Sequence, residues 1–248
     1  MAKRFSVWLG TTIDPAYGSV ADIQGAVRAL RPPGSWSLEA LWKGGEGGSW
    51  QSQFDPHPLA ISGPDRLAEL RAAGTKLSPK LTVTPYIVLR GRPAWNDAEW
   101  AQIAACAEVA GRVVLNLEEG PAYWNGPTDA EALTREYILP LKARLPEKAS
   151  LELCCIPRQW VIDALGGRDC LIAWAYACQS ASWEAYDAVA PDLDVAASMG
   201  RVMSWLEPTD RMWKPRYYTP LVQRSRIDAW AQTGYCKHGM QVWWIDGD

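Results

Sequence analysis

The residues best suited to chemistry lie in the stretch Arg112-Val-Val-Leu-Asn-Leu-Glu-Glu-Gly120. Its apolar start is typical of a buried parallel strand, and its carboxylates come where such a strand ends. Asn116 and Glu118 are two residues apart and so share one face of the strand, whereas Glu119 points the other way. A carboxyl group beside an amide is suited to general acid catalysis, with Glu118 as the acid and Asn116 as its hydrogen-bonding neighbour. A solvated loop that begins at Glu118 is the alternative.

The composition limits the kinds of partner and cofactor. The chain has 248 residues, with 25 basic and 28 acidic residues interspersed and a net charge of -3, so we expect no nucleic-acid partner. Its two histidines, His57 and His238, are far apart, and its six cysteines form no C-x-x-C pair. We therefore expect reduced, buried thiols, no metal and no cofactor. Two distant histidines also give little support for a Ser-His-Asp hydrolase.

Targeting signals are not evident in the sequence. The first residues run straight into a strand without the apolar stretch of a signal peptide, and the longest apolar run, Cys170 to Cys178, is about half of what a bilayer requires. We expect synthesis in the cytoplasm and no membrane partner. Delivery as part of a larger assembly with protein partners, for instance a virion, is compatible with these features.

Strand-like and helix-like segments alternate along the whole chain. The expected strands are 5–10, 36–43, 81–89, 112–119, 150–156, 170–178, 214–222 and 240–245, and the expected helices are 19–30, 64–73, 97–110, 129–144, 158–165, 182–205 and 225–233. Eight strands, each but the last followed by a helix, predict a single (β/α)8 barrel, or TIM barrel, over residues 1–248. A doubly wound open sheet is the alternative, but no G-x-G-x-x-G follows the first strand.

A glycine-rich insertion, Gly44 to Gly63, interrupts the second strand-to-helix connection. It contains Gly44, Gly45, Gly47 and Gly48 together with two aromatic residues, Trp50 and Phe54. Long loops of this kind usually carry function. We expect it to lie over the barrel mouth as a lid or as a contact surface for another subunit.

Active sites of this fold lie at the C-terminal ends of the strands. The residues expected there include Asp14, Lys43, Arg90, Asn116, Glu118, Glu119, Tyr176, Gln179, Trp243, Trp244 and Asp246. Among these, Asp246 or Asp14 could supply a second carboxylate, and the tryptophans could stack on sugar rings. The fifteen tryptophans of this chain, against two phenylalanines, fit such a role at the strand ends.

A Glu after strand four, a Tyr on strand six and a Trp on strand eight resemble glycoside hydrolase barrels of the family 18 chitinase and family 25 lysozyme type. In those families a D-x-E motif ends in the Glu that protonates the leaving oxygen. The resemblance implies that Asn116-Leu117-Glu118 matches D-x-E, that Tyr176 helps to hold the reacting group, and that Trp243 or Trp244 floors the sugar site. Asn116 replaces the first acid of the motif, and an amide cannot take up a proton.

Three functions are compatible with this pattern. The first is a glycoside hydrolase-like barrel that acts on a cell-wall or chitin-like polysaccharide, with Glu118 as general acid. The second is a non-catalytic barrel for carbohydrate binding or structural assembly, for example in a phage tail. The third, an enzyme of phosphorylated metabolites, predicts a glycine-rich phosphate site after strands seven and eight, and Gln223-Arg-Ser-Arg226 has no glycine.

Overall fold

The computed structural model describes residues 3–9, 17–50, 56–91, 95–118, 120, 123–155, 163–178, 180–186, 202–207 and 239–244. The strands in these residues are β1 (Arg4–Leu9), β2 (Ser37–Glu46), β3 (Ser49–Trp50), β4 (Leu81–Val88), β5 (Arg112–Asn116), β6 (Ser150–Cys155), β7 (Ser180–Tyr186), β8 (Val202–Glu207) and β9 (Gly239–Trp244). The helices are α1 (Val20–Ala29), α2 (Pro64–Thr75), α3 (Asp97–Ala110), α4 (Ala130–Leu133), the π-helical turn η1 (Thr134–Ile138), α5 (Leu139–Arg144) and α7 (Gly167–Ala177).

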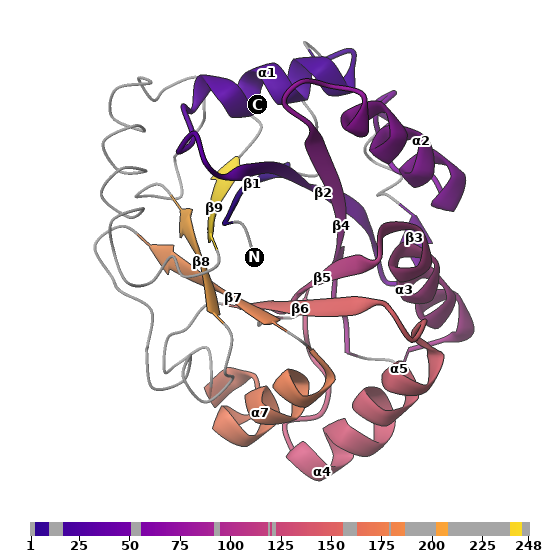
Figure 1. Ribbon diagram of the computed structural model, residues 1–248. Coiled ribbons are helices and arrows are strands. Elements are labelled where there is room, and N and C mark those ends of the chain that lie inside the picture. The colour runs from indigo at the N-terminus through magenta and orange to yellow at the C-terminus, as the bar shows by residue number, and fades with distance from the viewer. Residues whose placement is uncertain are drawn as a thin grey trace.

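All these strands belong to one curled sheet. Their order is β1-β9-β8-β7-β6-β5-β4-β2-β3, and β1 pairs with β2 as well as with β9. Within the described residues, neighbouring strands run parallel except β2 and β3. Figure 1 shows the strands around a common centre with the described helices outside them. The predicted α/β class is therefore confirmed as a curled parallel sheet with outer helices.

Local sequence explains where the helices begin and end. Ser19 caps α1 in a capping box with Asp22, and Asn96 does the same for α3 with Glu99. Pro64 occupies the first turn of α2, where its missing N–H costs no hydrogen bond. Helix α3 ends at Gly111, which adopts the left-handed conformation with φ of 69°.

The helix expected over 129–144 is continuous but irregular. Its central turn, Thr134–Ile138, is π-helical, and Pro140 follows in the first turn of α5. Proline lacks an N–H group and its ring collides with the carbonyl four residues earlier, so a regular α-helical turn is disfavoured there. The wider π-turn accommodates the proline without breaking the helix.

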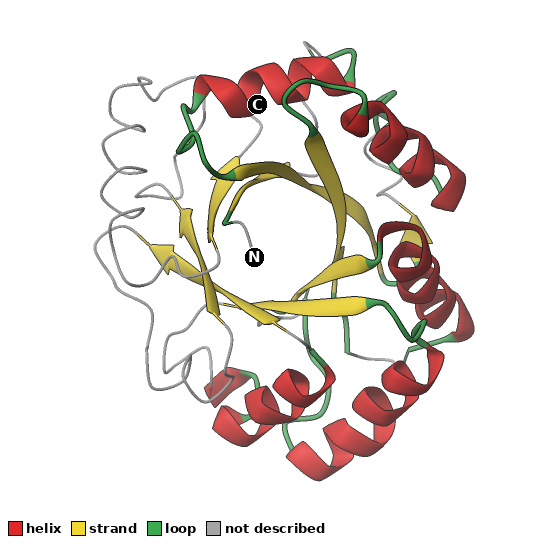
Figure 2. Cartoon of the chain, viewed as in Figure 1, coloured by secondary structure: helices red, strands yellow, loops and turns green. Residues whose placement is uncertain are grey.

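Outer and inner faces of the sheet bury different side chains. A large apolar cluster joins outward-facing strand residues to the helices, which surround the strands in Figure 2. A separate cluster contains only strand residues from alternating positions: Trp8, Leu41, Tyr86, Val88, Val114 and Cys154. Because alternate residues of a strand face opposite sides, this second cluster lies on the inner face of the curled sheet.

Part of the expected insertion is regular structure. Strand β2 continues to Glu46 with an irregularity between Lys43 and Gly45, and a two-residue Gly47-Gly48 turn, both residues with positive φ, joins it to β3. Further along, Leu59 and Ile61 are buried in the core, and the Trp42 Nε1–H donates to the Leu59 carbonyl at 3.1 Å. These flanks are core structure and not a lid, while residues 51–55 lie outside the described residues.

The strand expected over 170–178 is wrong, because this segment belongs to helix α7. A short apolar run cannot be assigned to strand or buried helix by periodicity alone. Its buried residues are Cys170, Leu171, Trp174 and Ala177, which is helical spacing. Strand β7 follows at Ser180–Tyr186, so the helix expected over 182–205 is also wrong at its start, and β8 occupies its end. The expected strand 214–222 and helix 225–233 lie outside the described residues.

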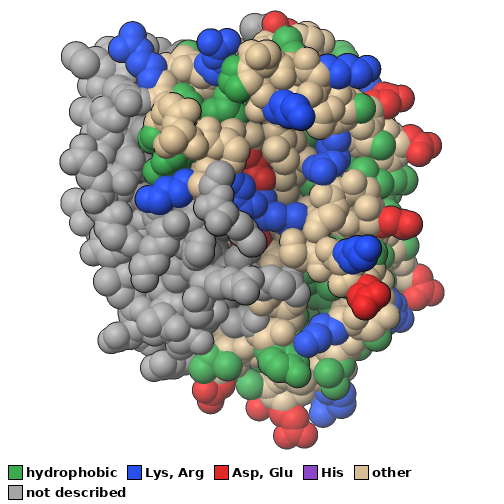
Figure 3. Space-filling model, in the orientation of Figure 1, with side chains coloured by type: hydrophobic (Ala, Val, Ile, Leu, Met, Phe, Trp, Pro, Cys, Tyr) green, Lys and Arg blue, Asp and Glu red, His purple; other side chains and the backbone are tan. Residues whose placement is uncertain are grey.

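The described surface carries mixed charges. Figure 3 shows one face on which the described residues include Lys and Arg as well as Asp and Glu side chains. None of the helices in the described part of the chain is both long and apolar enough to cross a membrane.

Candidate functional site

Asn116 and Glu118 form a hydrogen-bonded pair at the C-terminal end of β5. The Asn116 Nδ2–H donates to Glu118 Oε1 at 2.6 Å. Asn116 is only 2% exposed, whereas Glu118 is half-buried. Val114, two residues earlier on the same face, belongs to the inner cluster, so Asn116 points inward as well. The structure therefore brings the two central residues of the sequence prediction together.

The buried amide of Asn116 has a second polar atom. Its Oδ1 is buried and has no hydrogen-bond partner among the described residues. Leaving a buried acceptor unpaired costs about 1–3 kcal/mol, so such an atom is unusual in a folded protein. An acceptor of this kind can receive a hydrogen bond from an N–H or O–H group of a bound molecule.

Two cations share one carboxylate at the ends of β2 and β4. The Lys43 Nζ lies 3.0 Å from Glu46 Oε2, and an Arg90 guanidinium nitrogen lies 3.0 Å from Glu46 Oε1. Lys43 is buried and in register with Tyr86, whose side chain belongs to the inner cluster. These charged groups therefore lie at the same end of the sheet as Glu118. Strand β4 is next to β5, and β2 is the strand after that.

An aromatic pair of the inner cluster lies beside these polar groups. The rings of Trp8 and Tyr86 have their centroids 4.6 Å apart, and the Tyr86 hydroxyl donates to the Leu9 carbonyl at 2.9 Å. Both side chains are buried. They are part of the apolar inner cluster.

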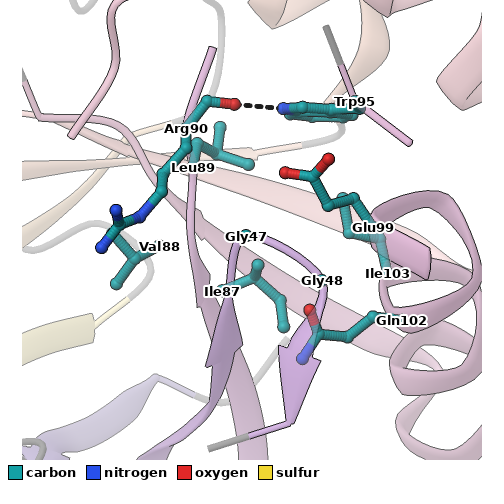
Figure 4. Close-up of a pocket in the computed structure, with 10 residues that line it drawn as sticks. All are labelled: Gly47, Gly48, Ile87, Val88, Leu89, Arg90, Trp95, Glu99, Gln102 and Ile103. Atoms are coloured by element: carbon teal, nitrogen blue, oxygen red, sulfur yellow. Dashed lines mark hydrogen bonds between the residues drawn. The ribbon is translucent and has the colours of Figure 1, made fainter. Parts of the chain in front are cut away.

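A small pocket lies beside this end of the sheet, between the Gly47-Gly48 turn, the end of β4 and helix α3. Figure 4 shows Arg90, Trp95, Glu99 and Gln102 among the side chains around it. Burial raises the pKa of the Glu99 carboxyl, against the opposite effects of the Asn96 N–H and Arg90. Because Glu99 also completes the cap of α3, we assign it to the helix and not to chemistry.

The other buried carboxylates lie at the opposite end of the strands. Glu39 accepts hydrogen bonds from Ser6 at 2.5 Å and from Thr84 at 2.6 Å, and it is ion-paired with Arg112. Glu152 accepts from the Arg112 Nε–H at 3.1 Å. Burial acts to raise the pKa of Glu39, but Arg112, Arg4 and the two hydroxyls outweigh it and lower that pKa. Glu39 is therefore held charged by its partners.

Most of the other predicted site residues cannot be joined to this pair. The prediction that Tyr176 lies on a strand is wrong, because this residue belongs to α7. Its side chain is 70% exposed, and the Lys142 Nζ lies 3.9 Å from the centroid of its ring. Trp243 and Trp244 lie on β9 in register with Trp8 and Leu9. The remaining candidates lie outside the described residues: Asp14, Glu119, Gln179 and Asp246.

Sequence reasoning missed Glu46 and Trp124. Glu46 was overlooked because the strand seemed to end at Lys43, although the Gly47-Gly48 pair is a signal for a hairpin turn. Trp124 lies in the loop after β5, and its backbone N–H donates to the Glu118 carbonyl at 2.9 Å. No local sequence signal marks that contact.

No known protein family and no curated protein matches the sequence. Solved structures do match it. An endo-beta-1,4-mannanase double mutant from Cellulomonas fimi aligns over 99% of this chain and 66% of its own length, with a TM-score of 0.55 and 10% identity. The spore cortex-lytic enzyme SleL of Bacillus megaterium aligns over 100% and 71%, with a TM-score of 0.51 and 12% identity.

A third similar structure, a GH18 chitinase from Pseudoalteromonas aurantia, aligns over 98% of this chain and 94% of its own, with a TM-score of 0.50 and 12% identity. The chain spans about half, 52%, of the Bacillus cereus SleL structure that it also matches. Sequence identities this low show a similar fold and nothing about function. The resemblance to glycoside hydrolase barrels is confirmed at that level.

Proposed function

We propose that this chain is a glycoside hydrolase-like barrel that acts on a cell-wall or chitin-like polysaccharide, with Glu118 as the general acid. The observation that carries the proposal is the Asn116–Glu118 pair at the C-terminal end of a strand in a curled parallel sheet. Parallel barrels bind ligands and perform chemistry at that end. A half-buried carboxyl that an amide holds in place is suited to protonating a leaving oxygen.

The proposal includes a complete (β/α)8 repeat. Support comes from the pairing of β1 with both β9 and β2, which brings the first and last strands side by side. A crystal structure with an outer helix between β7 and β8 and another between β8 and β9 would complete the repeat. An extended connection in either place would contradict it.

Asn116 has a binding role in this proposal. An amide cannot cycle a proton, so we assign it to holding Glu118 through Nδ2 and to receiving a substrate N–H or O–H on its buried, unpaired Oδ1. An N-acetylated sugar presents both kinds of donor. This supports amino-sugar polymers, such as chitin and peptidoglycan, as the first substrates to test.

Trp243 is the proposed sugar-stacking residue, and Trp244 serves as its control. In a parallel pair, residues in register lie on the same face, and Trp243 is in register with Trp8 of the inner cluster. Replacing Trp243 by Ala should weaken oligosaccharide binding more than the same change at Trp244. Equal effects would remove Trp243 from the site.

The central test is Glu118→Gln, which keeps the size and hydrogen bonding of the side chain and removes its proton. If Glu118 is the general acid, the rate should fall by about 10²-fold or more while polysaccharide binding is kept. The assay measures reducing-end release and retention on insoluble substrate, with purified peptidoglycan and chitin oligomers. Glu108→Gln, at an exposed position of α3, is the matched control and should leave both quantities unchanged.

Three results would contradict the proposal in different ways. Binding without turnover in the unaltered protein would support a carbohydrate-binding module. Absence of both binding and turnover would support a structural role, for example in a phage tail. Full activity of Glu118→Gln would leave the hydrolase but remove Glu118 as its acid.

A further inference from the structure

The loop after β5 is anchored in an aromatic cluster outside the sheet. The Trp124 ring is buried and lies 5.1 Å from Tyr137 and 5.3 Å from Trp174, both at steep interplanar angles. Trp95, from the loop after β4, contacts the same rings at 5.0 to 6.4 Å. Edge-to-face contacts between aromatic rings are worth about 0.5–1.5 kcal/mol each beyond simple burial, so this cluster is a rigid support.

Two glycines bring the loops after β4 and β5 into direct contact. A Cβ atom on Gly91 would overlap the backbone of Gly126, and one on Gly126 would overlap the Trp124 ring. The Tyr137 hydroxyl donates to the Gly91 carbonyl in the same place. The two loops are therefore packed directly against each other, and Trp124 lies at their junction.

Trp124 also reaches the candidate acid directly. Its backbone N–H donates to the Glu118 carbonyl at 2.9 Å. The aromatic cluster therefore fixes the position of the Glu118 backbone, which carries the carboxyl side chain. At the other side of that residue, the Leu117 N–H donates to Cys154 of β6 at 2.8 Å. Glu118 is therefore held between the sheet and the aromatic cluster.

We propose that Trp124 is the positioning residue for Glu118, fixing its carboxyl against Asn116 from outside the sheet. This deepens the proposed function and rests on it for its catalytic consequence. The geometric part, that the Trp124 ring maintains the Asn116–Glu118 hydrogen bond, stands on the contacts alone and can be tested without any substrate.

The structure offers a matched control for this proposal. The indole nitrogens of Trp124 and Trp174 are both buried without a hydrogen-bond partner among the described residues, so changing either residue to Phe loses ring volume but no hydrogen bond. Trp174 belongs to the same cluster but lies on α7, and no hydrogen bond between it and Glu118 is found in the described contacts. Trp124→Phe and Trp174→Phe should therefore lower the melting temperature to a similar extent.

The first measurement is the NMR signal of the Asn116 side-chain amide, which reports its bond to the Glu118 carboxylate. We expect it to shift in Trp124→Phe toward its position in Glu118→Ala, which lacks the acceptor, and to remain in place in Trp174→Phe. Gly126→Ala, which pushes on the same ring, should reproduce the shift if Trp124→Phe does not fold. An unchanged signal in folded Trp124→Phe, or an equal shift in Trp174→Phe, would overturn the proposal.

The second measurement is steady-state kinetics on the oligosaccharide that the unaltered protein cleaves. A displaced acid should lower kcat by about tenfold to a hundredfold with KM changed less than about twofold. Equal losses of kcat in both variants would reduce Trp124 to a core residue and overturn the proposal. If the unaltered protein cleaves nothing, the proposed function fails, while the NMR result still decides whether Trp124 positions Glu118.

Discussion

At the N-terminal end of the strands, Glu39 and Glu152 are buried and surrounded by arginines and hydroxyls, whereas at the C-terminal end Glu118 is half-buried beside an amide. In the first arrangement, the negative charges of the two glutamates are balanced by the positive charges of Arg4 and Arg112. The second holds the carboxyl through the Asn116 amide and leaves the buried Oδ1 of Asn116 without a hydrogen-bond partner among the described residues. Carboxylates of one sheet thus serve two purposes, and their partners decide which.

The comparison has a physical basis. A buried carboxylate costs several kcal/mol to desolvate, and arginine pairing with further hydrogen bonds offsets that cost while holding the group ionised. Such a group stabilises the fold but has no proton to give near neutral pH. A half-buried carboxyl with solvent on one side can exchange protons with a bound molecule. Location at the C-terminal strand ends and the unpaired acceptor on Asn116 therefore point to function together, and neither does so alone.

The largest expected effect comes from Arg112→Met. This change removes the guanidinium shared by Glu39 and Glu152 and leaves both carboxylates buried with fewer partners. We expect the free energy of unfolding to fall by about 3–5 kcal/mol, the usual result of removing one side of a buried ion pair. Urea denaturation followed by tryptophan fluorescence measures it. A decrease of less than about 1 kcal/mol in the free energy of unfolding would show that the ion pairs of Arg112 with Glu39 and Glu152 do not stabilise the fold.

A smaller effect is expected from pH. The pKa of Glu39 is lowered in the folded protein, so its contribution to stability is complete above its ordinary value of 4.5 and is lost as the pH falls through the lower folded value. Melting temperatures between pH 7 and pH 3 should therefore fall on the acid side. In Glu39→Gln this part of the fall should be reduced, and an identical pH profile in both proteins would contradict the assignment.

The smallest effect is expected from Arg90→Met at the other end. The Arg90 side chain is 42% exposed and pairs with Glu46, which Lys43 also contacts. Exposed pairs contribute about 0–1 kcal/mol, so stability should change little in the same urea experiment. A loss as large as that of Arg112→Met would mean that the two ends do not differ in the way described.

The sequence predicted the first repeating elements well. Helix α3 has the expected bounds, 97–110, α1 begins within one residue of its expected start, and the pairing of Asn116 with Glu118 follows from the period of two along β5. The same alternation fails for the run from Cys170 to Cys178, since an all-apolar segment has no period to read. Its helix is decided by the buried face that Leu171 and Trp174 form.

The support of the candidate site was beyond sequence reasoning for a different reason. Trp124 contacts Trp174, and Gly91 contacts Gly126, and both contacts join residues that are distant in the sequence. The roles of Trp124 and Gly91 therefore depend on how two loops meet outside the sheet. Glu46 depends on the irregularity between Lys43 and Gly45, which lets β2 continue beyond its apparent end. Long-range contacts of this kind leave no periodic signal.

The most direct measurement sets Glu118→Gln beside Glu39→Gln, with polysaccharide turnover per folded molecule and the free energy of unfolding determined for both. We predict that Glu118→Gln loses about 10²-fold or more of the turnover with nearly unchanged stability, and that Glu39→Gln loses stability while its folded fraction keeps full turnover. Loss of turnover in Glu39→Gln, or normal turnover with lower stability in Glu118→Gln, would contradict the account.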